Sequence, residues 1–258
     1  MSRSERPEKY GAQWSRDELI LAFELYCRIP FRKTKTSNPE VQALASLLGR
    51  SPAAVARKLG NFGAFDPELQ KQNIRGLVHT GRLDRQVWDE FHSDWGGLVW
   101  AASRLRKSLA KAQRMEEPFL EPSGPSEKPY TRKQRVHQSF FRHAVLSSYE
   151  ESCCITGLRL PECLIASHIV PWSCDERFRT DPTNGLCLSA TFDRLFDSGL
   201  FTLSDDLSVR VAKRLLRSAE TEVQELICLH HGKSIHKPRR FLPLPRHLKW
   251  HRSNVFLG

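Results

Sequence analysis

The sequence of 258 residues has no apolar run long enough to cross a bilayer, and its first residues lack the hydrophobic stretch of a secretion signal. We therefore expect a soluble, cytoplasmic protein that has no membrane partner. The sequence also lacks a Cys-x-x-Cys pair, and its seven cysteines are odd in number and irregularly spaced. This pattern argues against a disulfide framework, so we expect reduced thiols and no structural zinc.

Acidic residues are scarce relative to basic ones. The chain has 40 Lys and Arg against 29 Asp and Glu, which gives a formal net charge of +11. Residues 1–112 hold 19 basic and 12 acidic side chains, and residues 232–258 hold seven basic side chains and no acidic one. Excess positive charge favours polyanions through counterion release, but a solvated surface has the same composition. Charge alone leaves both interpretations open.

Residues 113–130 are rich in proline, glycine, serine and charge and have no hydrophobic period, which predicts an interdomain linker. We expect a mainly helical domain at 1–112 and a mixed domain at 131–258, so that the chain belongs to the α+β class. Aromatic residues at helical spacing usually fill a core rather than stack on bases. The aromatic residues to which this applies are Trp88, Phe91, Trp95 and Trp100, and Leu98 shares their helical spacing.

Three helices are predicted near the start of the chain. Ser15 and Glu18 form a capping-box signature, which predicts a helix over 16–28. Pro39 at a first helical position and Gly49 as a stop predict a second helix. Ser51 and the proline after it then predict a third helix, over 53–61.

The second and third helices have the outline of a helix-turn-helix, because Gly49 lies in a tight turn between them. In that arrangement the polar side chains of the third helix and its turn would face a groove of DNA. These side chains are Arg50, Arg57, Lys58 and Asn61. Residues 79–83 would form the hairpin turn of a wing. An ordinary three-helix bundle with a charged outer face has the same pattern, so this interpretation stays open.

The second domain begins with a helix predicted over 135–146. An apolar strand is predicted over 164–170 and a second, short strand over 186–188, followed by a helix that starts near residue 191 and ends before Gly199.

Asp193 and Asp197 are four residues apart, so on a helix they lie on the same face. Two like charges placed there repel each other by a few tenths of a kcal/mol, and a divalent cation removes this penalty. Hard oxygen ligands suit one Mg²⁺ or Mn²⁺ ion. Asp197 could instead bond backbone groups at the helix end.

His168 lies on the first predicted strand and is the candidate general base, since a neutral imidazole can deprotonate water. Asn184 opens the second strand and would either fix the loop between the strands or orient His168. Each residue also has a plain structural interpretation. A histidine on a buried strand is often a core residue, and Asn-Gly is first of all a turn signal.

Together these motifs resemble the HNH endonuclease family, whose ββα-metal site carries a histidine, an asparagine and metal ligands in this order. The segments that carry the resemblance are Cys154-Ile155-Thr156-Gly157, Ala166-Ser167-His168-Ile169, Asn184-Gly185-Leu186 and Phe196-Asp197-Ser198-Gly199-Leu200-Phe201. The resemblance implies that His168 is the general base, Asn184 the structural asparagine and Asp193 a metal ligand. The family often has a metal-binding residue where this chain has Ser167, and a histidine where it has Phe192.

The resemblance implies a DNA endonuclease that hydrolyses phosphodiester bonds with one Mg²⁺ or Mn²⁺ ion and leaves a 5′-phosphate. The first domain resembles the winged-helix domains attached to such nucleases, which implies a restriction enzyme acting on double-stranded, methylated DNA. A homodimer would allow both strands to be cut. The alternatives are a DNA-binding regulator with an inactive HNH-like scaffold and an RNA-directed nuclease.

Overall fold

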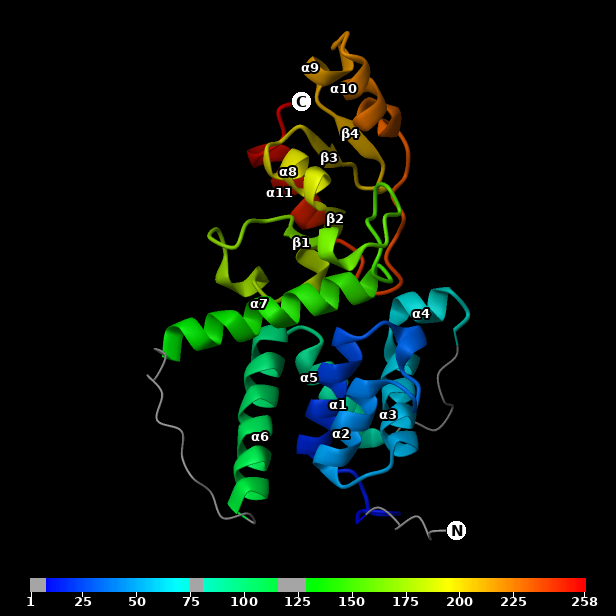
Figure 1. Cartoon of the computed structure of the whole chain (residues 1–258), viewed down its shortest axis with the longest axis vertical. Helices are drawn as coiled ribbons and strands as arrows, with labels where there is room; N and C mark the ends of the chain where they lie inside the picture. The colour runs from blue at the N-terminus through cyan, green and yellow to red at the C-terminus, as the bar shows by residue number, and fades with distance from the viewer. Residues whose placement is uncertain (1–7, 75–80, 116–128) are drawn as a thin grey trace. The chain divides into compact units, whose positions relative to one another are not determined.

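The computed structural model describes residues 8–74, 81–115 and 129–258, and the chain forms two compact units, 1–140 and 141–258 (Figure 1). The division falls within helix α7 (Pro129–Ser148), after the predicted linker. Most of that linker, residues 116–128, lies outside the described residues. In the ranges given above, no helix is both long and apolar enough to span a bilayer.

Unit 1 consists of helices in its described part. They are α1 (Arg16–Arg28), α2 (Pro39–Leu48), α3 (Pro52–Phe65), α4 (Pro67–Lys71), α5 (Arg82–Phe91) and α6 (Trp95–Met115). The three predicted helices are confirmed. The capping box of Ser15 and Glu18 starts α1, and Gly49 ends α2 in the left-handed conformation with φ 65°. Helix α3 runs past residue 61 because its first strong stop is Asp66, which Pro67 holds in an extended conformation.

The core of unit 1 is aromatic. The ring of Phe23 packs against Phe62 and Trp88, with centroid distances of 4.9 and 5.2 Å. The predicted core positions in α5 and α6 are confirmed except for Trp100, which is 47% exposed. The inward face of α6 is formed by Trp95, Leu98, Val99 and Ala102. Trp100 falls outside this helical period, so it faces outward.

The predicted wing is not supported by the described residues of unit 1, among which there is no strand. Gly81 caps α5, and Arg82 and Leu83 belong to that helix, so the predicted hairpin turn is wrong at these positions. The remainder of the turn, residues 79 and 80, lies outside the described residues. Helices α2 and α3 do pack against each other and against α1.

Unit 2 contains two small antiparallel sheets among helices, which confirms the α+β class. Its main elements are β1 (Leu164–His168), β2 (Gly185–Ser189), α8 (Ala190–Asp197), β3 (Phe201–Leu203), β4 (Val209–Val211), α9 (Lys213–Leu216), α10 (Thr221–Leu226) and α11 (Pro245–Asn254). Strand β1 pairs with β2, with His168 opposite Gly185, and α8 packs on both strands. The predicted order of two strands and a helix is therefore confirmed.

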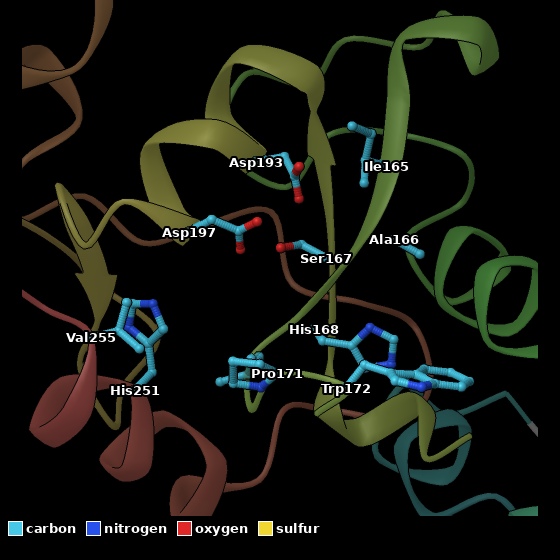
Figure 2. A pocket seen from close by; sticks show the side chains of 11 residues that line it. Ile165, Ala166, Ser167, His168, Pro171, Trp172, Asp193, Asp197, His251 and Val255 are labelled. Carbon is cyan, nitrogen blue, oxygen red and sulfur yellow. The ribbon is translucent and has the colours of Figure 1, made fainter. Parts of the chain in front are cut away.

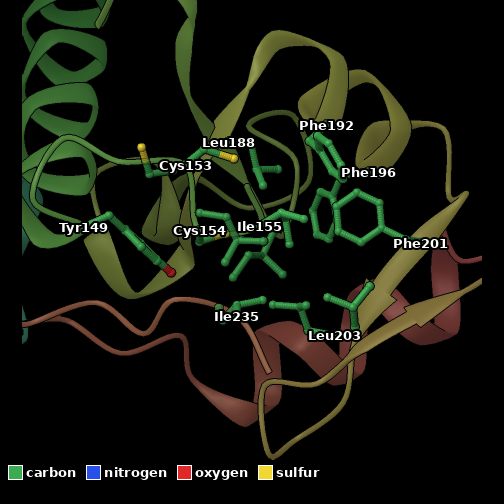
Figure 3. Packing of buried hydrophobic residues seen from close by; sticks show 14 of the residues in the cluster. Tyr149, Cys153, Cys154, Ile155, Leu188, Phe192, Phe196, Phe201, Leu203 and Ile235 are labelled. Carbon is green, nitrogen blue, oxygen red and sulfur yellow. The ribbon is translucent and has the colours of Figure 1, made fainter. Parts of the chain in front are cut away.

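The core of unit 2 lies under α8 and between the two sheets (Figure 3). The ring of Phe201 packs there against Phe196 and Phe192, with centroid distances of 5.4 and 6.0 Å. Cys153, Cys154 and Cys187 belong to the same core and are buried as free thiols. Burial raises the pKa of the Cys154 thiol, so it stays protonated and packs as a small apolar group.

Helix α7 approaches the β1–β2 sheet closely at Gly185. A Cβ atom at this position would lie 2.2 Å from Val145 Cγ2 and 3.0 Å from Phe141 Cζ, both on α7. We expect Gly185→Ala to destabilise the protein by about 1 to 3 kcal/mol, because the core would be overpacked. The measurement is urea unfolding followed by circular dichroism.

Gly60→Ala on α3 is the matched control. Apart from its chain neighbours and the backbone of its own helix, no atom lies within 4 Å of a Cβ atom built there, and alanine favours a helix interior. Its unfolding midpoint should be unchanged or higher. If Gly185→Ala unfolds at the same midpoint as Gly60→Ala, α7 does not pack as closely as described.

Candidate active site

A cavity of about 460 Å³ in unit 2 is lined by residues of β1, α8 and α11 (Figure 2). Successive side chains of a strand point to opposite faces, so β1 directs Ser167 and His168 in opposite directions. The cavity extends past both residues, and its wall includes Asp193, Asp197 and His251.

Helix α8 presents Asp193 and Asp197 to this cavity, which confirms that the two carboxylates lie on one helix face. Partial burial raises the pKa of Asp197, and the nearby charge of Asp193 raises it further, against a smaller opposing effect of Arg194. The fold therefore disfavours the charged form of Asp197, and a bound cation would relieve this penalty.

The hydroxyl of Ser167 points toward both carboxylates in Figure 2. Ser167 is only 3% exposed, and its Oγ atom has no hydrogen-bond partner among the residues that the structure describes. Buried hydroxyl groups in folded proteins nearly always have a partner. An unsatisfied oxygen beside two carboxylates fits a bound cation, which would take the hydroxyl as a neutral ligand.

This donor set consists of oxygen atoms only, which suits Mg²⁺ or Mn²⁺ better than zinc. Within the described ranges, no group of three or more His, Cys, Asp or Glu side chains is placed to hold a metal. Two carboxylates and one hydroxyl leave coordination positions for water or phosphate oxygens, as Mg²⁺ sites in proteins commonly do.

The imidazole of His168 points away from the carboxylates, toward Trp172 (Figure 2). Its ring stacks on Phe141 with the centroids 3.6 Å apart, and it meets the edge of Trp172 at 5.6 Å. The imidazole of His168 and the carboxylates of α8 therefore do not face the same point of the cavity. The residue that joins the carboxylates is Ser167, because adjacent residues of one strand cannot both face α8.

Burial lowers the pKa of His168 to about 4, so its ring is neutral near pH 7. The Nε2 atom lies 3.2 Å from the backbone carbonyl of Arg179. Because a carbonyl oxygen only accepts hydrogen bonds, Nε2 carries the proton, and Nδ1 keeps the lone pair that a general base requires.

Asn184 is fully buried and fixes the loop between β1 and β2. Its Oδ1 accepts from Val170 N at 2.8 Å, and its Nδ2 donates to Val170 O at 3.0 Å and to Phe178 O at 3.3 Å. Of its two predicted roles, the geometry favours loop fixation, since its amide bonds backbone groups and not the His168 ring.

His251 of α11 contacts the last turn of α8 through Phe196. Its ring stacks on Phe196 with the centroids 3.8 Å apart. Its Nε2 lies 3.2 Å from Phe196 O, and its Nδ1 lies 2.9 Å from Thr202 Oγ1. Nε2 therefore donates to the carbonyl and Nδ1 accepts from the hydroxyl, so neither nitrogen is open to a metal.

Phe192, where the family often has a histidine, packs in the core and contacts Phe201 and His230. It does not face the cavity and cannot be replaced by a ligand without rebuilding that core. No role was predicted from the sequence for Ser167 or His251. Strand alternation does indicate that only one of residues 167 and 168 faces α8, but not which one.

The candidate DNA contacts of unit 1 are mostly occupied inside that unit. Arg50 is buried and pairs with Glu18, and Lys58 pairs with Asp84, with shortest distances of 2.8 Å in both pairs. Asn61 is 4% exposed and donates to Asp84. The prediction that Asn61 lies on the outward face of the third helix is therefore wrong, because its side chain points into unit 1. Arg57 is the one residue of the four that is exposed.

Comparison with known families agrees with this arrangement. Residues 153–204 match the family model for HNH endonucleases, a range that includes β1, β2, α8 and β3. This match supports the resemblance inferred from the motifs for this segment of the chain. No curated protein matches the chain.

His251 makes the stability of the protein depend on pH. Burial lowers its pKa to about 4, whereas an unfolded histidine titrates near 6.5. The neutral ring is favoured by the fold, so its contribution is fully present above pH 6.5 and is lost as the pH falls toward 4. Between pH 7 and pH 5 we expect a loss of about 2 kcal/mol in the free energy of unfolding.

His251→Gln tests this dependence, because the amide can donate to Phe196 O and accept from Thr202 without titrating. Urea unfolding at pH 7 and pH 5 should show a smaller loss for this variant than for the unsubstituted protein. Replacing the exposed His143 with Gln is the control and should leave the loss unchanged. An equal loss in the His251 and His143 variants would contradict the assignment.

Proposed function

We propose that unit 2 hydrolyses phosphodiester bonds of double-stranded DNA with one Mg²⁺ or Mn²⁺ ion held by Asp193, Asp197 and Ser167. The observation that carries this proposal is the unsatisfied Ser167 Oγ atom, which points at two carboxylates in a cavity that His168 also lines. A bound ion would supply positive charge for the phosphate and the leaving oxygen.

The separation of His168 from the carboxylates suits in-line attack. The attacking water and the leaving oxygen lie on opposite sides of phosphorus, so the base and the cation belong at different ends of the substrate site. His168 Nδ1 would accept the proton of the water, and the Arg179 carbonyl would stabilise the proton on Nε2 as charge develops. Phe141 and Trp172 hold the ring in place.

DNA as the substrate is supported by the net charge of +11 and by the match of residues 153–204 to the HNH endonuclease family. We further propose that the enzyme is of the restriction type and that unit 1 directs it to methylated DNA. Cleavage of both strands would then use a homodimer, with one cavity for each strand.

His168→Ala should lower the rate of plasmid cleavage by about 10²- to 10⁴-fold, because the proton acceptor is lost. DNA binding measured without divalent ions should stay unchanged. His143→Ala removes an exposed histidine and is the control for both measurements. Cleavage by His168→Ala at the unsubstituted rate would end the assignment of His168 as base.

Asp193→Asn should weaken Mn²⁺ binding by at least about tenfold, because one of two negative charges is lost. Ser167→Ala should weaken it by a smaller factor, since it removes a neutral ligand. Calorimetric titration of the resting protein measures both effects without DNA. Glu222→Gln, on the exposed side of α10, is the charge-matched control and should bind Mn²⁺ normally. Normal Mn²⁺ binding by Asp193→Asn would exclude this cation site.

Plasmids with different methylation states test the substrate assignment. With Mg²⁺ or Mn²⁺ we expect faster nicking or linearisation of methylated plasmid than of unmethylated plasmid, with 5′-phosphate ends. Equal cleavage rates on methylated and unmethylated plasmid would reject the dependence on methylation, but the proposal of nuclease activity would stand. Mobility shifts without any nicking would indicate an inactive regulator, and preferred cleavage of structured RNA would indicate an RNA-directed nuclease.

A further inference from the structure

Unit 1 contains a cavity of about 380 Å³ where the segment before α1 runs beside the start of α3. Basic and aromatic side chains form much of its wall, and no acidic residue lines it. The charged and aromatic lining residues are Lys9, Tyr10, Trp14, Arg50, Arg57 and Lys58. A concave surface with this lining is suited to an anion.

The wall of this cavity is held in place by Arg50. The guanidinium group donates to Ala12 O at 3.0 Å and to Gln13 O at 2.8 Å, and it forms two hydrogen bonds with Glu18. Lys9 N also donates to the carbonyl of Gly49 at 3.1 Å. The segment is therefore fixed to the turn between α2 and α3, so the cavity is part of the folded unit.

The cavity keeps an excess of positive charge after its internal ion pairs are considered. Glu18 serves both Arg50 and Lys9, and hydrogen bonds from Arg50, Ser15 and Lys9 outweigh the effect of burial and lower its pKa to about 2. The single negative charge of Glu18 therefore balances only one of the two positive charges of Lys9 and Arg50. Arg57 is exposed and makes no ion pair with any residue in the described part of the chain.

Two further features add to the attraction of an anion. The cavity includes Ser51 and Ala53 at the first turn of α3, where the partial positive charge of a 14-residue helix is concentrated. The Ser51 hydroxyl already accepts from Ala54 N, which leaves the N–H group of Ala53 available. Trp14 lies beneath Arg50, with the guanidinium carbon 4.3 Å from its ring, and gives the cavity an apolar side.

We propose that this cavity binds a phosphate group of a DNA strand, with Lys9 and Arg57 as its charged contacts and Trp14 beside the sugar. The proposal rests on DNA being the substrate of the protein. This phosphate contact differs from the predicted helix-turn-helix, in which α3 would read base edges, because Asn61 of α3 points into unit 1. A phosphate contact positions the duplex but conveys no sequence preference, so it should act equally on all DNA sequences.

The test is binding of short DNA duplexes in the absence of divalent ions, measured by fluorescence anisotropy over a series of salt concentrations. The double variant Lys9→Gln, Arg57→Gln should lower the slope of log affinity against log salt by about 1 to 2, since each lost phosphate contact removes close to one released counterion. The decrease in this slope should be the same for duplexes of unrelated sequence.

Arg104→Gln, Lys107→Gln on α6 is the matched control, since it removes the same charge from exposed positions outside the cavity. Its slope should stay close to that of the unsubstituted protein. Equal losses in the two double variants would overturn the proposal, because the charges would then act only through the overall field.

Two substitutions of Ser51 distinguish an effect of charge on DNA binding from an effect on folding. Ser51→Asp and Ser51→Asn both keep an effective helix cap but differ in charge. We expect the aspartate to weaken DNA binding and the asparagine to bind normally. Equal binding by the two variants would contradict the phosphate site.

Cleavage measured in parallel separates this inference from the proposed nuclease function. Normal cleavage and normal binding by the cavity variants would reject the phosphate site alone. If DNA binding depends on the cavity residues but the unsubstituted protein cuts no DNA, only the proposed nuclease function is rejected. A complete lack of DNA binding by the unsubstituted protein would reject both.

Discussion

The geometry of unit 2 depends on the buried side chain of Asn184. Its amide bonds both the N–H and the carbonyl of Val170, and thereby closes the loop that joins β1 to β2. β1 therefore ends at His168, with Ser167 directed to one side of the strand and His168 to the other. Loss of these bonds would leave buried backbone groups unsatisfied and free the loop that carries Arg179.

The cavity beside β1 has two chemically different ends. At one end, Asp193 and Asp197 concentrate negative charge next to an unsatisfied hydroxyl, and a bound cation would balance that charge. At the other end, burial keeps His168 neutral, and a backbone carbonyl fixes its tautomer. A phosphodiester has the charge and the two-sided reaction geometry that such an arrangement can serve. His251 supports the acidic end by holding the last turn of α8.

Local signals in the sequence predicted much of the fold. The capping box at Ser15, the stop at Gly49 and the pair of strands before α8 all appear as expected, because each depends on neighbouring residues. The carboxylate pair was predicted for the same reason, since helical spacing sets its face. Burial of Asn61 and the direction of the His168 ring depend on contacts with Asp84 and Phe141, which are distant in sequence and could not be inferred from spacing.

The central claim is that Asp193, Asp197 and Ser167 form one cation site. Anomalous diffraction from crystals of the protein grown with Mn²⁺ tests it most directly. We expect one anomalous peak within coordination distance, about 2.0 to 2.4 Å, of both carboxylates and the Ser167 hydroxyl. A peak at another position, or fully occupied Mn²⁺ elsewhere with this site empty, would contradict it.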